Sequence, residues 1–325
     1  MRRPGGAMGE EWPRIDLTKL KTYPLHSRLS KVQAADLGRA WTPGGTLTEF
    51  LERLPRILAG SDFRAVVAAI LAARRRGKPV IAGLGGHVIK VGCSPHLIDL
   101  MERGLVTALA MNGACAIHDF ELAYAGFTSE EVEAGLPAGE FGMAAETGET
   151  VNQAVQEGRA KGWGFGHALG EKIRALKLPH EALSLFAAAA RLGLPATVHV
   201  AIGTDIVHMH PACDGAAVGE ATLRDFHLLT RVVATMGGGG VYLNLGSAVL
   251  LPEVFVKALT VARNAAHPVT DFTTVNCDFL QHYRPTQNVV RRPVAGGAGK
   301  GYALTGHHEI LLPLLCAALV EGWEG

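Results

Sequence analysis

Short apolar runs alternate along this chain with longer segments that are apolar on one side only, and this alternation predicts the order of its elements. Apolar runs that end in small residues predict strands at 78–86, 105–114, 194–202 and 269–280, and residues 241–259 predict a strand, a Gly-Ser turn and a helix. Amphipathic segments predict helices at 61–77, 94–104, 150–160, 166–175, 180–193, 220–236 and 307–322. Strands alternating with helices in this way indicate an α/β fold, with a doubly wound, mostly parallel sheet covered by helices on both faces.

The first sixty residues follow a different pattern. They carry prolines at 12, 24, 43 and 55, and only 42–58 contains a short helical segment. We therefore expect an N-terminal extension at 1–60 and a single α/β domain at 61–325, a length that one domain can reach.

Polar and small residues gather where the predicted strands end. Ligands of open parallel sheets bind beyond the carboxyl ends of the strands, so these positions are the first candidates for a site. "GLGGHVIK" after the first strand resembles a phosphate-binding turn, although a tight turn explains it equally well. "MGGGGVYLNLGS" lets a ligand approach the backbone closely, and Ser247 can cap a helix whose free N–H groups hold an anion.

The stretch "GTDIVHMHPACDG" after the third strand is the densest group of polar residues, and it has three interpretations. On an extended backbone His208 and His210 share a face, and Asp205 could orient one of them as a general base. Alternatively, both histidines and Asp214 could hold a metal ion with His307 or His308. The third possibility is a turn whose polar groups pair with one another.

Three further clusters are ambiguous. "NGACAIHDFELA" places His118 and Asp119 after the second strand, where they could act in catalysis or cap a helix. "TGHHEILLPLL" could cap the last helix or contact a ligand, and the loop "FLQHYRPTQNVVRRP" offers His282 and Arg284.

Composition narrows the class of protein. Hydrophobic residues make up 48% of the 325 positions, the net charge is +1, and the basic residues form no stripe that would suit a nucleic acid. No apolar run is long enough to span a bilayer, and the start of the chain lacks the apolar core of a signal peptide. Five widely spaced cysteines form no C-x-x-C pair. We expect a cytoplasmic enzyme that acts on a small molecule, without nucleic-acid or membrane partners.

Taken in order, several segments resemble the deoxyhypusine synthase family: "DLGRAW", "VGCSPHLIDLMERGLVTALAMNGACAIHDF", "LGLPATVHVAIGTDIVHMH", "GGGVYLNLGSA" and "YALTGHHEILLPLLCAAL". The resemblance implies a Rossmann-like, NAD-binding α/β fold and a homo-oligomer, a dimer or tetramer. Leu243 stands where the resemblance places the lysine that forms an imine, so we expect chemistry without that intermediate. Asn112, His118, Asp119 and Glu121 are also similar to a pattern of archaeal-type ornithine cyclodeaminases.

Together these observations predict an NAD-dependent enzyme that transiently oxidises an amine-bearing or hydroxyl-bearing carbon of a small substrate. The expected catalytic residues are His208, His210, Asp205, His118 and Asp119. The expected cofactor contacts are Gly85, Gly86, Lys90, Asn112, Gly113, Gly238, Gly239, Gly240, Ser247, Asn276, Thr305 and Gly306. The expected substrate contacts are Asp214, Asp278, His282, Arg284, His307, His308 and Glu309. The alternatives are a metal-dependent hydrolase and a non-catalytic dinucleotide-binding oligomer, and the choice between NAD and NADP stays open.

Overall fold

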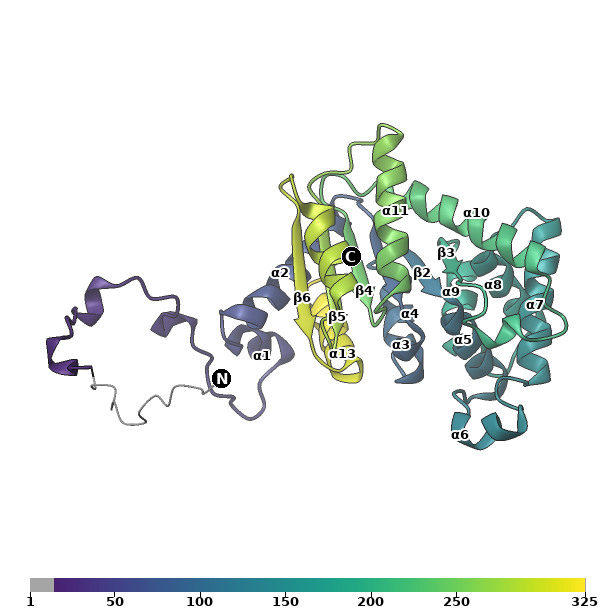
Figure 1. Ribbon diagram of the computed structural model, residues 1–325, viewed down its shortest axis with the longest axis horizontal. Coiled ribbons are helices and arrows are strands. Elements are labelled where there is room, and N and C mark those ends of the chain that lie inside the picture. Colours follow the sequence, from purple (N-terminus) through teal and green to yellow (C-terminus); the bar gives the residue numbers. More distant parts are fainter. Residues whose placement is uncertain (1–14, 325) are drawn as a thin grey trace, which may run out of the picture.

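A computed structural model describes residues 15–324 of the chain. Its centre is a sheet of six parallel strands in the order β3-β2-β1-β4-β5-β6 (Figure 1). The strands are β1 Val80–Leu84, β2 Ala108–Asn112, β3 Ala196–His199, β4 Val241–Leu245, β5 Thr273–Asp278 and β6 Lys300–Thr305. This architecture confirms the predicted doubly wound parallel sheet.

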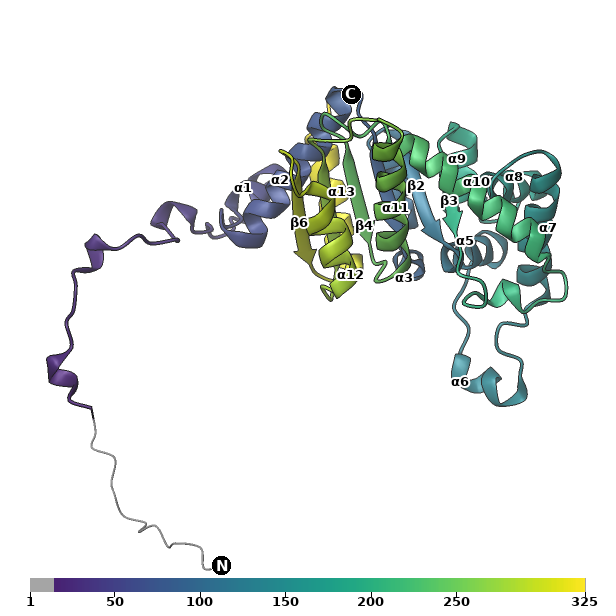
Figure 2. The same cartoon turned by 45° about the horizontal axis from the view of Figure 1, so that its top comes forward.

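Helices cover both faces of the sheet (Figures 1 and 2). They are α1 Leu47–Arg53, α2 Leu58–Arg75, α3 Gly86–Lys90, α4 Ser94–Glu102, α5 Gly113–Ala125, α6 Val132–Gly135, α7 Ala145–Ala160, α8 Phe165–Leu176, α9 Leu185–Leu192, α10 Gly215–Val233, α11 Leu250–Asn264, α12 Tyr283–Pro285 and α13 His308–Glu321. A π-helical segment, Thr286–Arg291, follows α12. No helix among the described residues is both long and apolar enough to cross a bilayer.

Alternation along the strands divides the core in two. In β1, Val80, Ala82 and Leu84 point into a large cluster that includes residues of α2, α4, α5, α9 and α13, whereas Ile81 points into a smaller cluster with α10 and α11. All five residues of β1 are buried, because the strand is central and covered on both faces. The continuous apolar run at this position therefore has a clear physical cause.

Several predicted boundaries are wrong. The third strand is only Ala196–His199, because the chain after it turns into a loop and one 3-10 turn at Ile206–His208. Helix α10 begins at Gly215 rather than near 220, since the Asp214 carboxylate accepts the amide hydrogens of Ala216 and Ala217 and caps it. Helix α6 lies in a stretch for which no helix was predicted, and α7 begins at Ala145, ahead of the predicted start at 150.

The N-terminal extension is described from residue 15 onward. Residues 15–46 contain three single 3-10 turns, Leu17–Lys19, Leu25–Ser27 and Ala34–Asp36, and they stand away from the α/β body (Figures 1 and 2). Helix α1 is the first element that packs on the body, against α13.

Candidate active site

The chain order of the sheet reverses between β1 and β4, which makes this the switch point where doubly wound folds bind ligands. The two strand exits are joined there by a hydrogen bond from the Gly85 amide to the Leu245 carbonyl, 2.9 Å long. A Cβ atom on Gly85 would lie only 2.2 Å from the carbonyl oxygen of Gly246. Glycine at position 85 therefore allows the two backbones to touch.

Glycines extend this close packing on both sides of β1. A Cβ on Gly86 would lie 3.0 Å from Cβ of Ala114 and 3.1 Å from Cδ2 of His118, so α3 packs tightly on α5. A Cβ on Gly113 would lie 2.1 Å from the Asp205 carboxylate. The predicted residues Gly85, Gly86, Gly113 and Asp205 thus lie along one edge of the sheet.

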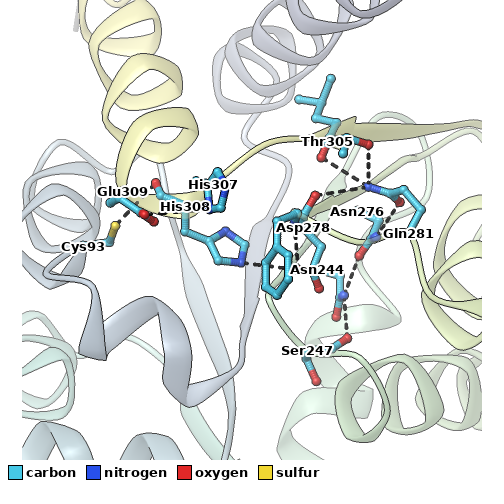
Figure 3. Close-up of polar contacts among 12 residues, drawn as sticks. Cys93, Asn244, Ser247, Asn276, Asp278, Gln281, Thr305, His307, His308 and Glu309 are labelled. Atoms are coloured by element: carbon cyan, nitrogen blue, oxygen red, sulfur yellow. Dashed lines mark hydrogen bonds and ion pairs between the residues drawn. The ribbon is translucent and has the colours of Figure 1, made fainter. Parts of the chain in front are cut away.

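His308, at the start of α13, is the most unusual side chain of this edge (Figure 3). It is 1% exposed, and within the described chain neither ring nitrogen has a hydrogen-bond partner. Its Nε2 would lie 2.6 Å from a Cβ on Gly246, and 3.9 Å separates it from Oδ1 of Asp278. Burial lowers the pKa of His308 against the opposing charge of Asp278, so the ring is neutral near pH 7.

A chain of side-chain hydrogen bonds links the exits of β4, β5 and β6 (Figure 3). The amide of Asn244 donates to Oδ1 of Asn276 at 2.7 Å, Asn276 donates to Oε1 of Gln281 at 2.8 Å, and Gln281 donates to the Thr305 hydroxyl at 3.2 Å. Asn244 and Asn276 are fully buried, and Oδ1 of Asn244 has no partner among the described residues. Asn276 and Thr305, both predicted as cofactor contacts, are therefore held in place by a network that sequence reasoning did not find.

Ser247 also has a defined partner. Its hydroxyl oxygen accepts the amide hydrogen of Leu251, in the first turn of α11, at 3.1 Å. Val249 directly precedes the helix and provides no side-chain cap, so Ser247 caps α11 from two residues further back. The predicted capping role is thus present. Contact between Ser247 and an anion stays a prediction.

A second group of polar side chains lies on the α5 side of the switch point. Nδ1 of His118 is 2.7 Å from the Thr128 hydroxyl, and that hydroxyl donates its hydrogen to Oε2 of Glu121 at 2.5 Å. Because the one hydroxyl hydrogen goes to Glu121, Thr128 accepts from Nδ1–H, and Nε2 of His118 keeps a free lone pair. Nε2 adjoins Cδ2, the ring atom nearest Gly86, so this lone pair is on the side of the ring that borders the glycine edge.

Glu121 is suited to hold His118 in this state. Burial opposes ionisation of Glu121, but hydrogen bonds from His118, Thr128 and Thr147 outweigh it and lower its pKa. Thr128 and Thr147 carry no motif, and only the folded loop between α5 and α7 brings them to Glu121.

The geometry argues against the predicted general bases His208 and His210. They do not share the face of an extended strand, because His208 lies in the 3-10 turn after β3. Nδ1 of His208 accepts the Gly203 amide hydrogen at 3.2 Å, and Nδ1 of His210 accepts that of Ala212 at 3.1 Å. Both lone pairs are thus occupied by the backbone, and the interpretation as a well-paired turn explains most of this stretch.

Asp205 remains at the glycine edge after this correction. It is 9% exposed, and burial raises its pKa, while the nearby His208 opposes the shift. Nε2 of His208 is buried, and the described residues offer it no partner. A ligand at this end of the edge would meet both groups.

The metal-cage interpretation does not fit the arrangement of its proposed ligands. Asp214 caps α10, His210 packs against Gly148 of α7, and His307 and His308 follow β6, far along the sheet from β3. Over residues 15–324, no three His, Cys, Asp or Glu side chains come together as a metal site.

Other predicted residues occupy structural positions. Asp119 is completely buried and accepts hydrogen bonds from the Ser184 hydroxyl at 2.5 Å and the Leu185 amide at 2.7 Å, so it anchors the start of α9. Arg284 pairs with Glu253 of α11 at 3.3 Å, and His282 is an exposed residue before α12. Asp119, Asp214 and Arg284 thus have structural partners, whereas the substrate contact of His282 stays a prediction.

The glycine run was also misplaced. Gly238, Gly239 and Gly240 precede β4 and so lie at the amino edge of the sheet, opposite the switch point. Gly238 donates its amide hydrogen to Thr270, and positive φ angles of 78° and 117° at Gly238 and Gly239 explain the need for glycine. The run therefore forms a turn away from the switch point, and nothing in the structure supports the cofactor contacts predicted for these three residues.

The remaining predicted residues lie around the rim of the carboxyl edge. Lys90 ends α3 and is exposed, Asn112 caps α5 through the Cys115 amide, and a Cβ on Gly306 would make only an ordinary contact with Leu311. His307 stacks on Phe279 with ring centroids 5.9 Å apart and lies 3.8 Å from Glu309. Sequence reasoning missed Phe279, which also contacts His87.

A pocket of about 340 Å³ adjoins the His118 group. Its lining includes the carboxylates of Glu121, Glu130 and Glu146 and the rings of Tyr124 and Phe127. No lysine, arginine or histidine is among the described residues that line it. The pocket therefore suits a molecule with a cationic end and an apolar stem.

No protein-family model and no curated protein matches this sequence. Among solved structures, a candidate deoxyhypusine synthase from Entamoeba histolytica superposes with a TM-score of 0.50 at 9% identity, over 87% of this chain and 96% of that one. The chain shares its fold with deoxyhypusine synthase.

Unliganded AgrE superposes with a TM-score of 0.53 at 15% identity, over 80% of this chain and 32% of AgrE. The ternary complex of AgrE with ornithine and NAD+ gives 0.50 at 16% identity, over 83% and 34%. This chain thus spans about a third of AgrE, and at these identities the likeness shows the fold alone.

Proposed function

We propose that this protein is an NAD-dependent enzyme that transiently oxidises an amine-bearing carbon of a small cationic substrate, without a lysine imine. The observation that carries the proposal is the set of unpartnered buried polar atoms at the carboxyl edge, on His308, Asn244 and His208. Buried polar groups are almost always paired, so an unpaired set along one edge indicates a ligand that supplies the partners. The two proteins named above support the proposal through their shared fold, and AgrE was crystallised with NAD+ and ornithine.

The residues present fit a dinucleotide. The edge from β2 to β5 crosses three strand spacings, about 14 Å at the usual ~4.8 Å each. Along it lie the close-packed glycines Gly85, Gly86 and Gly113, while His308 at one end and Asp205 at the other offer hydrogen-bonding groups. When bound, NAD would supply the hydride acceptor for the oxidation of carbon.

His118 is the general base that the geometry favours. Its Nε2 has a free lone pair, its Nδ1–H is fixed by Thr128, and the ionised Glu121 stabilises the positive charge that develops on the ring. His118 would take the proton from the substrate nitrogen as hydride leaves the neighbouring carbon. Leu243, in β4, is an apolar residue that is 2% exposed, so it contributes packing and no nucleophile.

The pocket of Glu121, Glu130 and Glu146 would receive the cationic end of the substrate. In this assignment the three glutamates replace Asp214 as the expected contacts of the substrate. Asp278 and Glu309 lie beside His308 and His307, at the end of the edge where the cofactor would bind.

The first test is binding. Mass spectrometry of small molecules released from the denatured protein, with elemental analysis for metals, should find NAD(H) and no stoichiometric metal. Titration with NAD+ should then show at least tenfold weaker binding in His308→Gln. His267→Gln should bind normally, because His267 is exposed and follows α11 at the amino edge. Metal without dinucleotide, or equal affinity of both variants, would contradict the proposal.

The second test is chemistry. In a panel of basic amino acids and polyamines, any compound that the enzyme turns over should be converted ~10²–10⁴-fold more slowly by His118→Gln. Thr128→Val should shift the pH profile of kcat, since it breaks the link between His118 and Glu121 while preserving side-chain volume. If the protein binds NAD+ but turns over no compound in the panel, the result would favour the non-catalytic alternative.

A further inference from the structure

Many large apolar side chains of the N-terminal arm, residues 15–41, are exposed to solvent. Every hydrogen bond within 15–35 joins residues at most three positions apart, and every residue of that range is exposed. Nine large apolar side chains of the arm lie open to solvent: Ile15, Leu17, Leu20, Tyr23, Leu25, Leu29, Val32, Leu37 and Trp41. So many exposed large apolar side chains within one segment indicate an interaction site.

The arm is also basic. It contains five lysines and arginines (Lys19, Lys21, Arg28, Lys31 and Arg39) against Asp16 and Asp36, which gives a net charge of +3. Segments that stay unstructured usually contain few apolar residues, whereas this arm contains many. Its apolar and basic character predicts a partner surface that is apolar and acidic.

Such a surface exists on the same chain, in residues 127–149, which include α6 and the first turn of α7 and are called the acidic loop below. The loop carries six glutamates and no lysine, arginine or histidine. It also exposes Phe127, Val132, Leu136 and Met143, with Phe127 74% and Leu136 62% open to solvent. Helix α6 within the loop extends beyond the α/β body (Figure 2).

The arm and the acidic loop lie at opposite ends of the molecule (Figures 1 and 2). We propose that the arm of one copy binds the acidic loop of a second copy, and that the second copy returns the same contact. A reciprocal pair of this kind has two-fold symmetry and closes as a dimer, so neither arm nor loop stays exposed. This proposal does not depend on the bound cofactor or on the reaction.

The acidic loop borders the pocket described above, since Phe127 and Glu130 belong to both. A docked arm would therefore cover one wall of that pocket with residues from the partner copy. Oppositely charged exposed groups attract more weakly as salt rises, whereas the apolar contacts persist. We expect the dimer to weaken, without disappearing, at high ionic strength.

Charge reversal in the full-length chain tests the contact. One variant carries Lys19→Glu, Lys21→Glu, Arg28→Glu and Lys31→Glu; the other carries Glu130→Lys, Glu131→Lys, Glu133→Lys and Glu140→Lys. All eight positions are exposed, so both variants should fold, and circular dichroism confirms it. Analytical ultracentrifugation should show a wild-type dimer and at least tenfold weaker self-association in each variant.

Mixing the two variants in equal amounts gives the decisive result. Each copy then offers what the other lacks, so the mixture should recover the dimer, with one copy of each variant per particle by native mass spectrometry. A wild-type monomer would overturn the proposal. Variants that dimerise like the wild type would also overturn it, because the dimer would then form through another surface. A mixture that stays monomeric would overturn it as well, because the arm and the acidic loop would then not bind each other.

Discussion

Gly85→Ala is the sharpest test of the packing at the switch point. The backbone of Gly85 has φ −92° and ψ 156°, an extended conformation that alanine adopts without strain. Any cost of the substitution therefore comes from the added methyl group. That methyl would sit 2.2 Å from the Gly246 carbonyl oxygen and 2.8 Å from its carbon.

The size of the effect follows from these distances. Ordinary carbon–oxygen contacts are about 3.3 Å, so the exits of β1 and β4 must separate by about 1 Å. Both are backbone segments in a buried sheet and cannot rotate away. Overpacking of this kind costs about 1–3 kcal/mol in the free energy of unfolding. The same shift should weaken NAD+ binding by at least tenfold.

Urea unfolding followed by tryptophan fluorescence measures the first quantity, and titration with NAD+ measures the second. Gly219→Ala is the matched control away from the carboxyl edge, since Gly219 is exposed in α10 and its methyl would meet nothing within 4 Å. We expect that control to be neutral or stabilised by about 0.4–1 kcal/mol, through the unfolded chain. If Gly85→Ala behaved like Gly219→Ala in both assays, the two strand exits would not be in contact as described.

Three further predictions concern buried polar groups. Tyr242→Phe should raise the unfolding free energy by about 1–2 kcal/mol in urea titrations, because the buried hydroxyl has no partner among the described residues; a loss would mean that it has one. Burial raises the pKa of Asp225 to about 7, so its stabilisation is complete below pH 4 and is lost as pH rises through 7. Between pH 5 and pH 8 the free energy of unfolding should therefore fall less in Asp225→Asn than in the wild type. If it fell equally with pH in both proteins, the raised pKa of Asp225 would be refuted. Ser184→Ala removes both the hydrogen bond to Asp119 and the cap of α9, so it should lower the free energy of unfolding by about 1–3 kcal/mol. An unchanged midpoint in urea unfolding would contradict this prediction.

The sequence predicted the layers better than the details of the site. The alternation of apolar strands and amphipathic helices reflects burial on both sheet faces, so the parallel sheet followed from it directly. The exits of β1, β2 and β5 were also found, because small and polar residues end those strands.

The errors share one cause. The roles of His208, His210 and Asp119 depend on which backbone amides lie next to them, and those amides belong to loops and helices whose positions no periodicity encodes. The same holds for Thr128, which joins His118 to Glu121 only after the loop beyond α5 folds back. Gly238 to Gly240 were misassigned because a glycine run before a strand and one after it look alike in sequence.

The strand order has a consequence for how the protein is made. Strand β1 can pair with β2 once both have left the ribosome, but its other neighbour is β4, where Val80 meets Val241. About 160 residues must be synthesised in between, which takes roughly 8–30 s at ~5–20 residues per second. During that interval the most apolar strand of the sheet has an open edge, which is a template for aggregation. Slow growth at low temperature, or a chaperone that covers this edge, should therefore raise the soluble yield more than any change at the surface of the finished fold.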